Sequence, residues 1–457
     1  MTLKRLTALL LTLCLAFALV LPTFAEDADD ITDPCECGEV VQVFVRGFLR
    51  ELYYDFGTEN QREAFMLLHL LMNDQGESIL EIDKHWQKSD IDDQDHEENP
   101  EYEFLYDYRM GAEETADQLR EFIKYLRIST GHEKVALSGM SQGTSIVMTY
   151  VAKYGTDWLD TIILINGSYQ GDVMLGELMV NHWGLSVPAT INFIQSLLPP
   201  SAIVNALFDL WRKLPLADLK TPASGDVAGP IGKWLYNIFI MNLIGHMPAI
   251  WTFLPASYQA EALERLVGDK YKTLRDLANW YYDNVMDKIP DLLNAALDAG
   301  VKVAIISSYG KAPIPLTANA TYQGDLIIDT ANESGGATVA PYGETLGPNY
   351  IQKKNDCGDN HLSSDGIIDA STCMLPERTW FVKNNGHYYV PSEDLRQWII
   401  HYDGQPTVWN NEMFPQFLSL TVDADGREGT EPMLDPPATQ PANLSEAFAN
   451  LLAALGL

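Results

Sequence analysis

Positive charge is scarce in this chain of 457 residues. It has 30 Lys and Arg against 63 Asp and Glu, which gives a formal net charge of −33. Such a field repels nucleic acid and anionic membrane surfaces at long range, so we expect no nucleic-acid partner. A hydrophobic content of 46% with 20% charged residues also excludes a disordered or fibrous chain. The length suits one large domain with an insertion, or two domains.

Long apolar runs are also few. Residues 1–25 carry Lys4 and Arg5, then an uncharged apolar stretch, then small residues ahead of the first acidic residues. This pattern predicts a secretory signal peptide, with cleavage expected after Ala25. The stretch is short for a membrane anchor. We therefore expect a secreted or extracytoplasmic protein.

Cysteine is sparse, with five residues in the chain, of which four follow the expected signal peptide. An even number in an exported chain favours disulfides, and a bridge between Cys357 and Cys373 is the simplest prediction. Cys35 and Cys37 are too close for an easy mutual bond, so cross-pairing with the other two, or free thiols, remain open. No His-x-x-x-His pair and no Cys and His cluster along the sequence indicates catalytic zinc. We predict no metal and no cofactor.

The most informative motif is Gly139-Met140-Ser141-Gln142-Gly143. A buried strand should precede it and a helix should follow it, which is the setting of a nucleophile elbow, a sharp turn that exposes a serine hydroxyl. Small residues are needed two positions before and after the serine, because neighbouring backbone packs closely there. Without this setting the pattern occurs by chance, and Ser141 would then be an ordinary loop residue. With it, Ser141 is the predicted nucleophile.

Strand and helix patterns alternate along much of the chain. Apolar runs predict strands at residues 40–45, 133–138, 161–166, 301–308 and 379–382, and an aromatic-rich strand end at residues 104–109. Helices are expected at residues 61–71, 113–126 and 395–401, and a further strand at residues 325–329. Such alternation predicts an α/β fold with a mostly parallel sheet and helices on both faces, and active sites of these sheets lie at the carboxyl ends of strands.

The strand signal disappears between residue 167 and about residue 290. Apolar helical stretches replace it, which we interpret as an inserted helical cap over the site. Residues 234–255 have no charge, but Asn237, Asn242 and the breaker sequence at residues 245–248 argue against a membrane span. An apolar inner face of the cap is the simple interpretation, and a lipid-binding face is the sharper one. The cap contains five of the ten tryptophans: Trp183, Trp211, Trp234, Trp251 and Trp280.

A serine nucleophile needs a base and a carboxylate that orients it, in the chain order Ser, acid, His for this fold. His387 follows the strand expected at residues 379–382, and we prefer it to His401, which lies late in a helix. Asp365, at a Ser-Asp-Gly turn, is the predicted acid. Competing acids nearby are Asp356, Asp359 and Asp369, and this segment or residues 423–426 could instead bind calcium.

An oxyanion hole completes such a site with two backbone amides. Gly47 follows the first strand, and a glycine there lets the backbone approach the substrate carbonyl. The predicted donors are the amides of Phe48 and Gln142. Alternatively, Gly47 only ends a strand.

The chain resembles the lecithin:cholesterol acyltransferase family of α/β-hydrolases. The resemblance spans most of residues 40–389 and is carried by the elbow and by four further segments: Val43 to Phe48, Phe104 to Arg109, Met247 to Pro255 and Tyr309-Gly310. Asp365-Gly366 and His387 stand where the family places its acid and base. Tyr108 replaces the family's usual tryptophan, and Gln142 replaces a smaller or apolar residue. The resemblance implies a lipase or O-acyltransferase.

The predicted organisation is a signal peptide (1–25), a hydrolase core in two parts (26–167 and 296–403), a helical cap (168–295) and a C-terminal tail (404–457). The predicted function is an exported serine hydrolase that acts on acyl esters of lipids through a Ser-His-Asp triad, with transient contact between cap and lipid surface. An exported lipid- or glycan-binding protein on the same scaffold, without turnover, is the alternative from another class. A peptidase is a further alternative.

Overall fold

The structure is a computed structural model that describes residues 31, 33–48, 72–78, 85–184, 186–198, 202–213, 234, 236–317, 319–387, 389–422 and 428–433. The expected signal peptide (1–25), the helix expected at residues 61–71, the second calcium candidate (423–426) and residues 434–457 of the tail lie outside these residues.

An eight-stranded sheet forms the centre of the molecule, in the order β10-β9-β8-β5-β4-β3-β1-β2. All neighbouring strands are parallel except β9 and β10, which are antiparallel. The strands are β1 (Gln42–Val45), β2 (Glu101–Phe104), β3 (Val135–Met140), β4 (Leu159–Ile165), β5 (Lys302–Tyr309), β8 (Thr379–Lys383), β9 (Phe417–Val422) and β10 (Glu428–Pro432). A separate small pair joins β6 (Thr338–Val339) and β7 (Ile368–Asp369).

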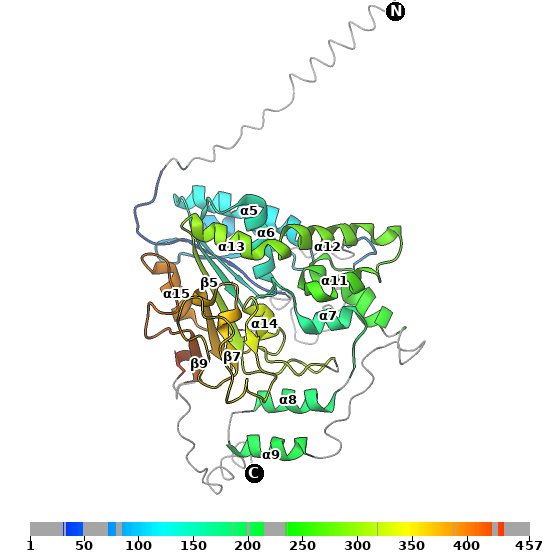
Figure 1. Ribbon diagram of the computed structural model, residues 1–457. Helices are drawn as coiled ribbons and strands as arrows, with labels where there is room; N and C mark the ends of the chain where they lie inside the picture. Colours follow the sequence, from blue (N-terminus) through cyan, green and yellow to red (C-terminus); the bar gives the residue numbers. More distant parts are fainter. Residues whose placement is uncertain are drawn as a thin grey trace, which may run out of the picture.

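Helices cover both faces of this sheet (Figure 1). One face packs against α5 (Ala112–Thr130), α6 (Gln142–Tyr154) and α13 (Ile289–Asp298), and the other against α15 (Glu393–His401). Each face of the sheet has its own hydrophobic core, and alternate residues of β4 pack into one or the other. Ile162 and Leu164 face the first group of helices, whereas Ile163 and Ile165 face α15. Strands buried on both faces read as continuous apolar runs, which is why the sequence revealed them. The mostly parallel sheet with helices on both faces has the predicted α/β-hydrolase fold.

The described residues between β4 and β5 contain no further strand, apart from an isolated bridge between Trp183 and Thr317. They form α7 (Val173–Met179), α8 (Val187–Leu197), α9 (Ala202–Arg212), α11 (Ala256–Leu263) and α12 (Lys272–Asn284), with the π-helix η2 (Tyr236–Gly245) and the 3₁₀ turns η3 (Pro248–Phe253), η4 (Asp269–Tyr271) and η5 (Met286–Lys288). In Figure 1, α8 and α9 lie beside each other, away from the sheet.

The uncharged segment 234–255 contains η2 and η3, which His246 and Met247 separate. Pro248 at the start of η3 ends the preceding helix, since proline cannot continue a helical hydrogen-bond pattern. None of the helices in the described part of the chain combines the length and the apolarity that a membrane crossing requires.

Three sequence expectations need correction. The strand β2, in which Tyr102 and Phe104 alternate inward, ends at the first residue of the aromatic stretch 104–109, and the rest of that stretch is loop. Residues 325–329 form a tight turn rather than a strand. The segment 417–432, placed in the tail, adds β9 and β10 to the sheet. The remaining short helices and turns are α4 (Ser89–Asp92), α14 (Thr330–Glu333), η6 (Ala370–Thr372) and η7 (Pro376–Arg378).

Candidate active site

Ser141 occupies the sharp turn between β3 and α6. Its backbone has φ 54° and ψ −125°, a conformation that L-residues rarely adopt. Two close approaches require the flanking glycines: a Cβ on Gly143 would lie 1.9 Å from the carbonyl oxygen of Val45, and a Cβ on Gly139 would lie 2.7 Å from that of Gly143. The turn therefore depends on the small residues that identified it in the sequence.

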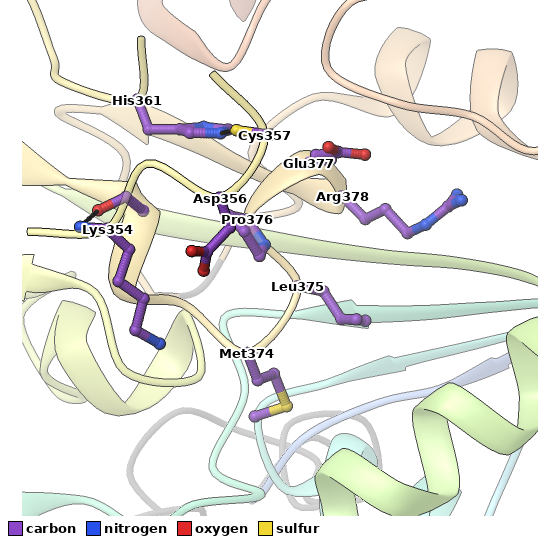
Figure 2. A pocket seen from close by; sticks show the side chains of 10 residues that line it. Lys354, Asp356, Cys357, His361, Met374, Leu375, Pro376, Glu377 and Arg378 are labelled. Atoms are coloured by element: carbon purple, nitrogen blue, oxygen red, sulfur yellow. Dashed lines mark hydrogen bonds between the residues drawn. The ribbon is translucent and has the colours of Figure 1, made fainter. Parts of the chain in front are cut away.

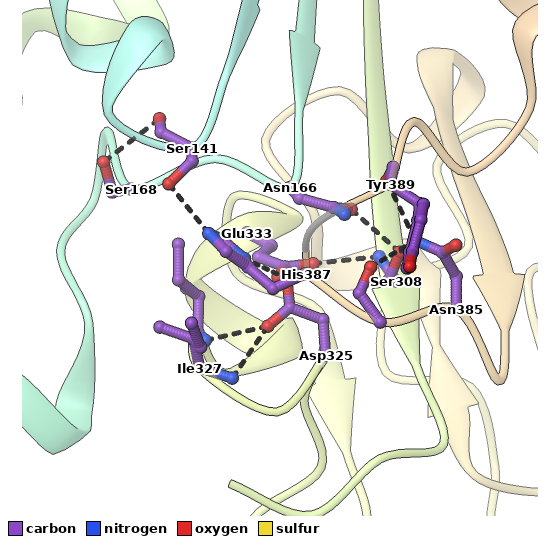
Figure 3. Close-up of polar contacts among 12 residues, drawn as sticks. Ser141, Asn166, Ser168, Ser308, Asp325, Ile327, Glu333, Asn385, His387 and Tyr389 are labelled. Atoms are coloured by element: carbon purple, nitrogen blue, oxygen red, sulfur yellow. Dashed lines mark hydrogen bonds and ion pairs between the residues drawn. The ribbon is translucent and has the colours of Figure 1, made fainter. Parts of the chain in front are cut away.

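His387 lies beside this serine, as Figure 3 shows. The distance between its Nε2 and the Oγ of Ser141 is 2.8 Å, which is hydrogen-bond length. The loop that carries it begins just after β8 and is fixed by Asn385, whose side chain donates to Ser308 Oγ at 3.0 Å and to Gly386 O at 2.9 Å. Ser308 in turn donates to Asn166 Oδ1 at 2.8 Å. The ends of β4, β5 and β8 thus position one imidazole.

The carboxylate next to His387 belongs to Asp325. Its Oδ2 lies 2.5 Å from His387 Nδ1, and its side chain is fully buried. An ionised carboxylate only accepts hydrogen bonds, so Nδ1 carries the proton and Nε2 is left to accept the proton of Ser141. Burial acts to raise the pKa of Asp325, but the charge and hydrogen bond of His387 outweigh it and lower that pKa.

The prediction that Asp365 is this acid is wrong. Asp365 binds Lys383 Nζ at 2.8 Å and accepts from Ser363 Oγ at 2.6 Å and from Tyr309 at 3.2 Å, so its oxygens are engaged elsewhere. The structure does not gather the competing acids 356, 359 and 369 with it: among the described residues, groups of three or more metal-binding side chains occur in two other places. The rejected base, His401, lies exposed at the end of α15.

Asp325 was missed because the apolar run after it resembles a strand. The structure instead folds it into a turn in which Asp325 Oδ1 accepts from the amides of Ile327 at 3.0 Å and Ile328 at 2.9 Å. Leu326 takes φ 94°, a strained value for a bulky residue. The available signal was the chain order Ser, Asp, His, which Asp325 satisfies as well as Asp365 does.

A second buried acid, Glu333 of α14, completes a cluster with Asp325 and His387, with potential metal-ligand atoms all within 4.8 Å of one another. Its Oε2 accepts from Ser307 Oγ and from the Ser308 amide, both at 2.9 Å. Burial, then the charge of Asp325 and a hydrogen bond with it, raise the pKa of Glu333 well above its usual range. This shift favours the protonated form of Glu333, and a protonated carboxyl can donate to the Asp325 carboxylate.

Both predicted oxyanion residues lie at the site. Gly47 packs on the nucleophile, since a Cβ there would lie 2.6 Å from Ser141 Cβ and 3.0 Å from its Oγ. Phe48 follows and lines the same cavity as Ser141. Gln142 is the first residue of α6, where backbone N–H groups have no partner within the helix. Its side chain points elsewhere and donates to the carbonyl oxygen of Tyr108 at 2.6 Å.

A cavity of about 450 Å³ opens onto Ser141 and His387. Most of its walls are apolar, contributed by the core, by the cap and by the Asp325 turn: Phe48, Met140, Met174, Leu175, Ile244, Ile250, Phe253, Ile327 and Ile328. Asp172, which also lines it, caps α7 through the amide of Met174 at 2.9 Å. Burial, then the charge of Asp329, raises the pKa of Asp172 well above its usual range, which favours the uncharged form of this carboxyl.

A second pocket, of about 340 Å³, lies near residues 354–378 and shares no lining residue with the first (Figure 2). Its lining combines charged side chains with the apolar Met374, Leu375 and Pro376. Within it Cys357 Sγ lies 3.1 Å from His361 Nε2. The predicted bridge between Cys357 and Cys373 is not formed, since the four cysteines among the described residues are free thiols. Burial raises the pKa of the Cys373 thiol to about 12.

The solved structures that resemble this chain are distant from it in sequence. No family model and no curated protein matches the chain. Structural neighbours include MGS-M2, an α/β hydrolase enzyme from a Medee basin deep-sea metagenome library (13% identity over 61% of this chain and 74% of the other, TM-score 0.19), and MenH from S. aureus (16%, 59% and 76%, TM-score 0.17). A third is Kex1(Δ)p, a prohormone-processing carboxypeptidase from Saccharomyces cerevisiae (10%, 87% and 88%, TM-score 0.27). Since these TM-scores are below 0.5, the fold assignment rests on strand order and connections.

Proposed function

We propose that this protein is a serine hydrolase that cleaves acyl esters of lipids, with Ser141 as nucleophile, His387 as general base and Asp325 as the acid that orients it. The single observation behind this proposal is the continuous chain of contacts from Ser141 Oγ through His387 to Asp325, 2.8 Å and 2.5 Å long. This chain of contacts opens into a largely apolar cavity. Nucleophile, base and orienting acid within hydrogen-bond reach define this class of chemistry.

The reaction follows from the positions of the protons. Ser141 Oγ attacks the ester carbonyl while its proton passes to His387 Nε2, and the carbonyl electrons move onto the oxygen. The amides of Phe48 and Gln142 stabilise that oxyanion. When the intermediate collapses, the bond to the leaving alcohol breaks and His387 returns the proton to it. Water, activated by the same imidazole, then releases the acid from Ser141.

The lining of the cavity favours an acyl chain over a polar substrate. A volume of about 450 Å³ is within the range of ligand pockets, and apolar walls stabilise a buried hydrocarbon by removing it from water. Arg46, at the cavity, forms an ion pair with Glu103 at 3.0 Å, so its charge is partly neutralised.

The acceptor of the acyl group is the second part of the proposal. The triad resolves an acyl-enzyme equally with water or with an alcohol, and the resemblance to acyltransferases of lipids makes a lipid alcohol the alternative acceptor. Export of the protein, from the signal-peptide pattern at residues 1–25, would place it where such lipids are met.

Contact with a lipid surface is proposed through the hairpin of α8 and α9. Arg212 at the end of α9 donates to Asn192 Oδ1 of α8 at 2.8 Å, which ties the two helices together. Apolar side chains of α8, of its C-cap and of α9 are exposed to solvent: Ile194, Leu197, Leu198, Leu207, Leu210 and Trp211. Clustered exposed apolar residues mark interaction surfaces more often than isolated ones do.

The nucleophile is tested with a fluorophosphonate probe. The wild-type chain should be labelled and Ser141→Ala should not, whereas Ser129→Ala, an exposed serine on α5, should be labelled normally. Equal labelling of the Ser141→Ala variant, or no labelling of folded wild type, would refute the proposal and favour a binding protein.

The substrate class is tested with a series of p-nitrophenyl esters of increasing acyl length. We expect kcat/KM to rise with chain length until the cavity is filled, because each buried methylene contributes about 0.8 kcal/mol of transfer free energy. Preference for acetyl esters or for peptides would contradict the lipid assignment. Adding a long-chain alcohol to the same assay separates the acceptors, since transfer yields a new ester.

The lipid surface is tested with the double variant Leu207→Ser/Leu210→Ser. Activity on vesicle-borne ester should fall several-fold while activity on a soluble short ester is unchanged. Val267→Ser is the matched control, because Val267 is 74% exposed but lies outside the hairpin. Equal vesicle activity in the double variant would remove the hairpin from the proposal.

A further inference from the structure

Four side chains of types that bind metals in other proteins converge at the amino ends of three strands. The candidate active site lies at the opposite, carboxyl ends of the strands. The four side chains are those of Cys35, Cys37, His96 and His132, and their ligand atoms all lie within 4.8 Å of one another. Cys35 and Cys37 precede β1, His96 precedes β2 and His132 precedes β3. These three strands are neighbours in the sheet, so their amino ends bring the four residues together although the sequence separates them widely.

The distances between the ligand atoms fit one metal ion. Cys35 Sγ lies 3.4 Å from His96 Nε2, and Cys37 Sγ lies 3.5 Å from His132 Nε2. In a tetrahedral zinc site with Zn–S of about 2.3 Å and Zn–N of about 2.0 Å, sulfur and nitrogen are separated by about 3.5 Å. Two thiolates and two imidazoles are also a donor set that suits Zn²⁺, and their charges would neutralise it.

The surroundings orient the ligands as a metal site requires. His132 Nδ1 lies 3.0 Å from the carbonyl oxygen of Thr130, so Nδ1 carries a proton and Nε2 has its lone pair free. The amide of Cys37 donates to Cys35 Sγ at 3.4 Å, a contact that stabilises thiolate charge. The rings of His96 and His132 meet edge to face, with centroids 5.2 Å apart.

The backbone around the cluster is packed for this arrangement. The amide of Cys35 donates to the carbonyl oxygen of Gly131 at 2.9 Å. Gly131 ends α5 with φ 72°, and a Cβ there would lie 2.4 Å from the carbonyl oxygen of Asp33. The segment before β1 therefore sits directly on the end of α5, and this contact fixes the spacing between both cysteines and His132.

We propose that Cys35, Cys37, His96 and His132 bind one Zn²⁺ ion, which ties the amino-terminal segment, the loop before β2 and the end of α5 together. Four protein ligands leave no open position for substrate, so the site is structural rather than catalytic. It does not depend on the proposed esterase activity, because its residues are distinct from those of the triad.

Metal content is the first test. Full-length protein purified without chelators should contain one zinc per chain by inductively coupled plasma mass spectrometry, and Co²⁺ in its place should give the intense visible bands of tetrahedral cobalt with a thiolate charge-transfer band. Cys37→Ser and His132→Ala should each lower the zinc content at least tenfold. The matched controls Cys357→Ser and His401→Ala should retain it.

Removal of the metal from wild type provides the second test and avoids variants that fail to fold. A strong zinc chelator should lower Tm by several degrees, and added Zn²⁺ should restore it, because an ion that binds only the folded state stabilises it. Fluorophosphonate labelling of Ser141 well below Tm should be unchanged. Absence of bound zinc together with an unshifted Tm, or a native Cys35 to Cys37 disulfide found by mass spectrometry, would overturn the proposal.

Discussion

The two ends of β1 and β3 carry two different assemblies. At their carboxyl ends lie Gly47 and Ser141, and at their amino ends lie Cys35, Cys37 and His132. Both assemblies draw residues from distant parts of the chain, because parallel strands gather equivalent ends at one edge.

The difference lies in burial and strain. Asp325, Glu333 and His387 are buried, and Ser141 and Leu326 both have positive φ. Each ligand of the zinc candidate is half-buried. A strained, buried cluster costs stability and is held by the rest of the fold, whereas a cluster joined by a metal would stabilise the fold itself. Changes at the first end should therefore alter rates, and changes at the second should alter Tm.

The largest expected effect comes from Asp325→Asn. Asparagine cannot hold the imidazole with its proton on Nδ1, so we expect kcat to fall by about 10³ to 10⁴ with Tm little changed. The matched variant Asp365→Asn should stay within a few-fold of wild type, since Asp365 pairs with Lys383 instead. Steady-state kinetics on a soluble ester decide between the two, and the reverse ranking would restore Asp365 as the acid.

Gly47→Ala should have the next largest effect. The added methyl would meet Ser141 Cβ at 2.6 Å, so either the loop or the nucleophile must move. A displacement of about 1 Å at reacting atoms can cost about 10²-fold in rate, and we expect kcat to fall by this order. Gly429→Ala, where φ is not positive and a Cβ would approach no atom closer than 3.5 Å, controls for general loss of glycine. A normal kcat in Gly47→Ala would show that the loop does not abut the nucleophile.

Glu333 should act more weakly, as a positioning residue for Asp325. If Glu333 is protonated, Glu333→Gln keeps a donor and the local charge, so the acid limb of the pH–rate profile should stay in place. Glu333→Ala removes the donor and should lower kcat about tenfold with KM unchanged. A shift of the acid limb to lower pH in Glu333→Gln would instead mean that Glu333 is ionised in the wild type.

The smallest effect concerns stability at the same end of the sheet. Burial, reinforced by the charge of Asp325, raises the pKa of Asp329 to about 6 from an ordinary value of 3.8. Because this pKa is higher in the folded state than in the unfolded state, Asp329 contributes to stability below pH 4. That contribution is lost as the pH rises through 6, and the loss is about 3 kcal/mol at most.

Asp329→Asn removes this titration. Between pH 4.5 and pH 7.5, the unfolding free energy of the variant should therefore rise relative to that of the wild type by roughly 1 to 3 kcal/mol. Asp369 is the control, since hydrogen bonds from Ser371 and Tyr350 outweigh burial and lower its pKa. Asp369→Asn should show no such shift in this window. Denaturant titrations at several pH values provide the measurement.

The structural features that were predicted correctly are those that depend on residues close together in the sequence. Glycines two positions either side of Ser141 and the apolar runs of β3, β4 and β5 are local signals, and the structure forms these elements where they were expected. His387 was identified by its place after a strand, and the structure puts it beside Ser141.

The sequence did not predict what depends on long-range packing. Asp325 and Asp365 both satisfy the chain order, and only the path of the loop after β5 decides which one reaches His387. The Cys and His cluster has no recognisable spacing, since 58 residues separate Cys37 from His96. Strand β9, which pairs with β8, was also missed.

The loops of Asp325 and His387 are also joined through the main chain, since the His387 amide donates to the carbonyl oxygen of Asp325 at 2.8 Å. Exchange of this one amide proton with deuterium requires the two loops to separate. Its protection factor would therefore report the free energy needed to disassemble the charge-bearing part of the site, in the resting protein and without any substrate.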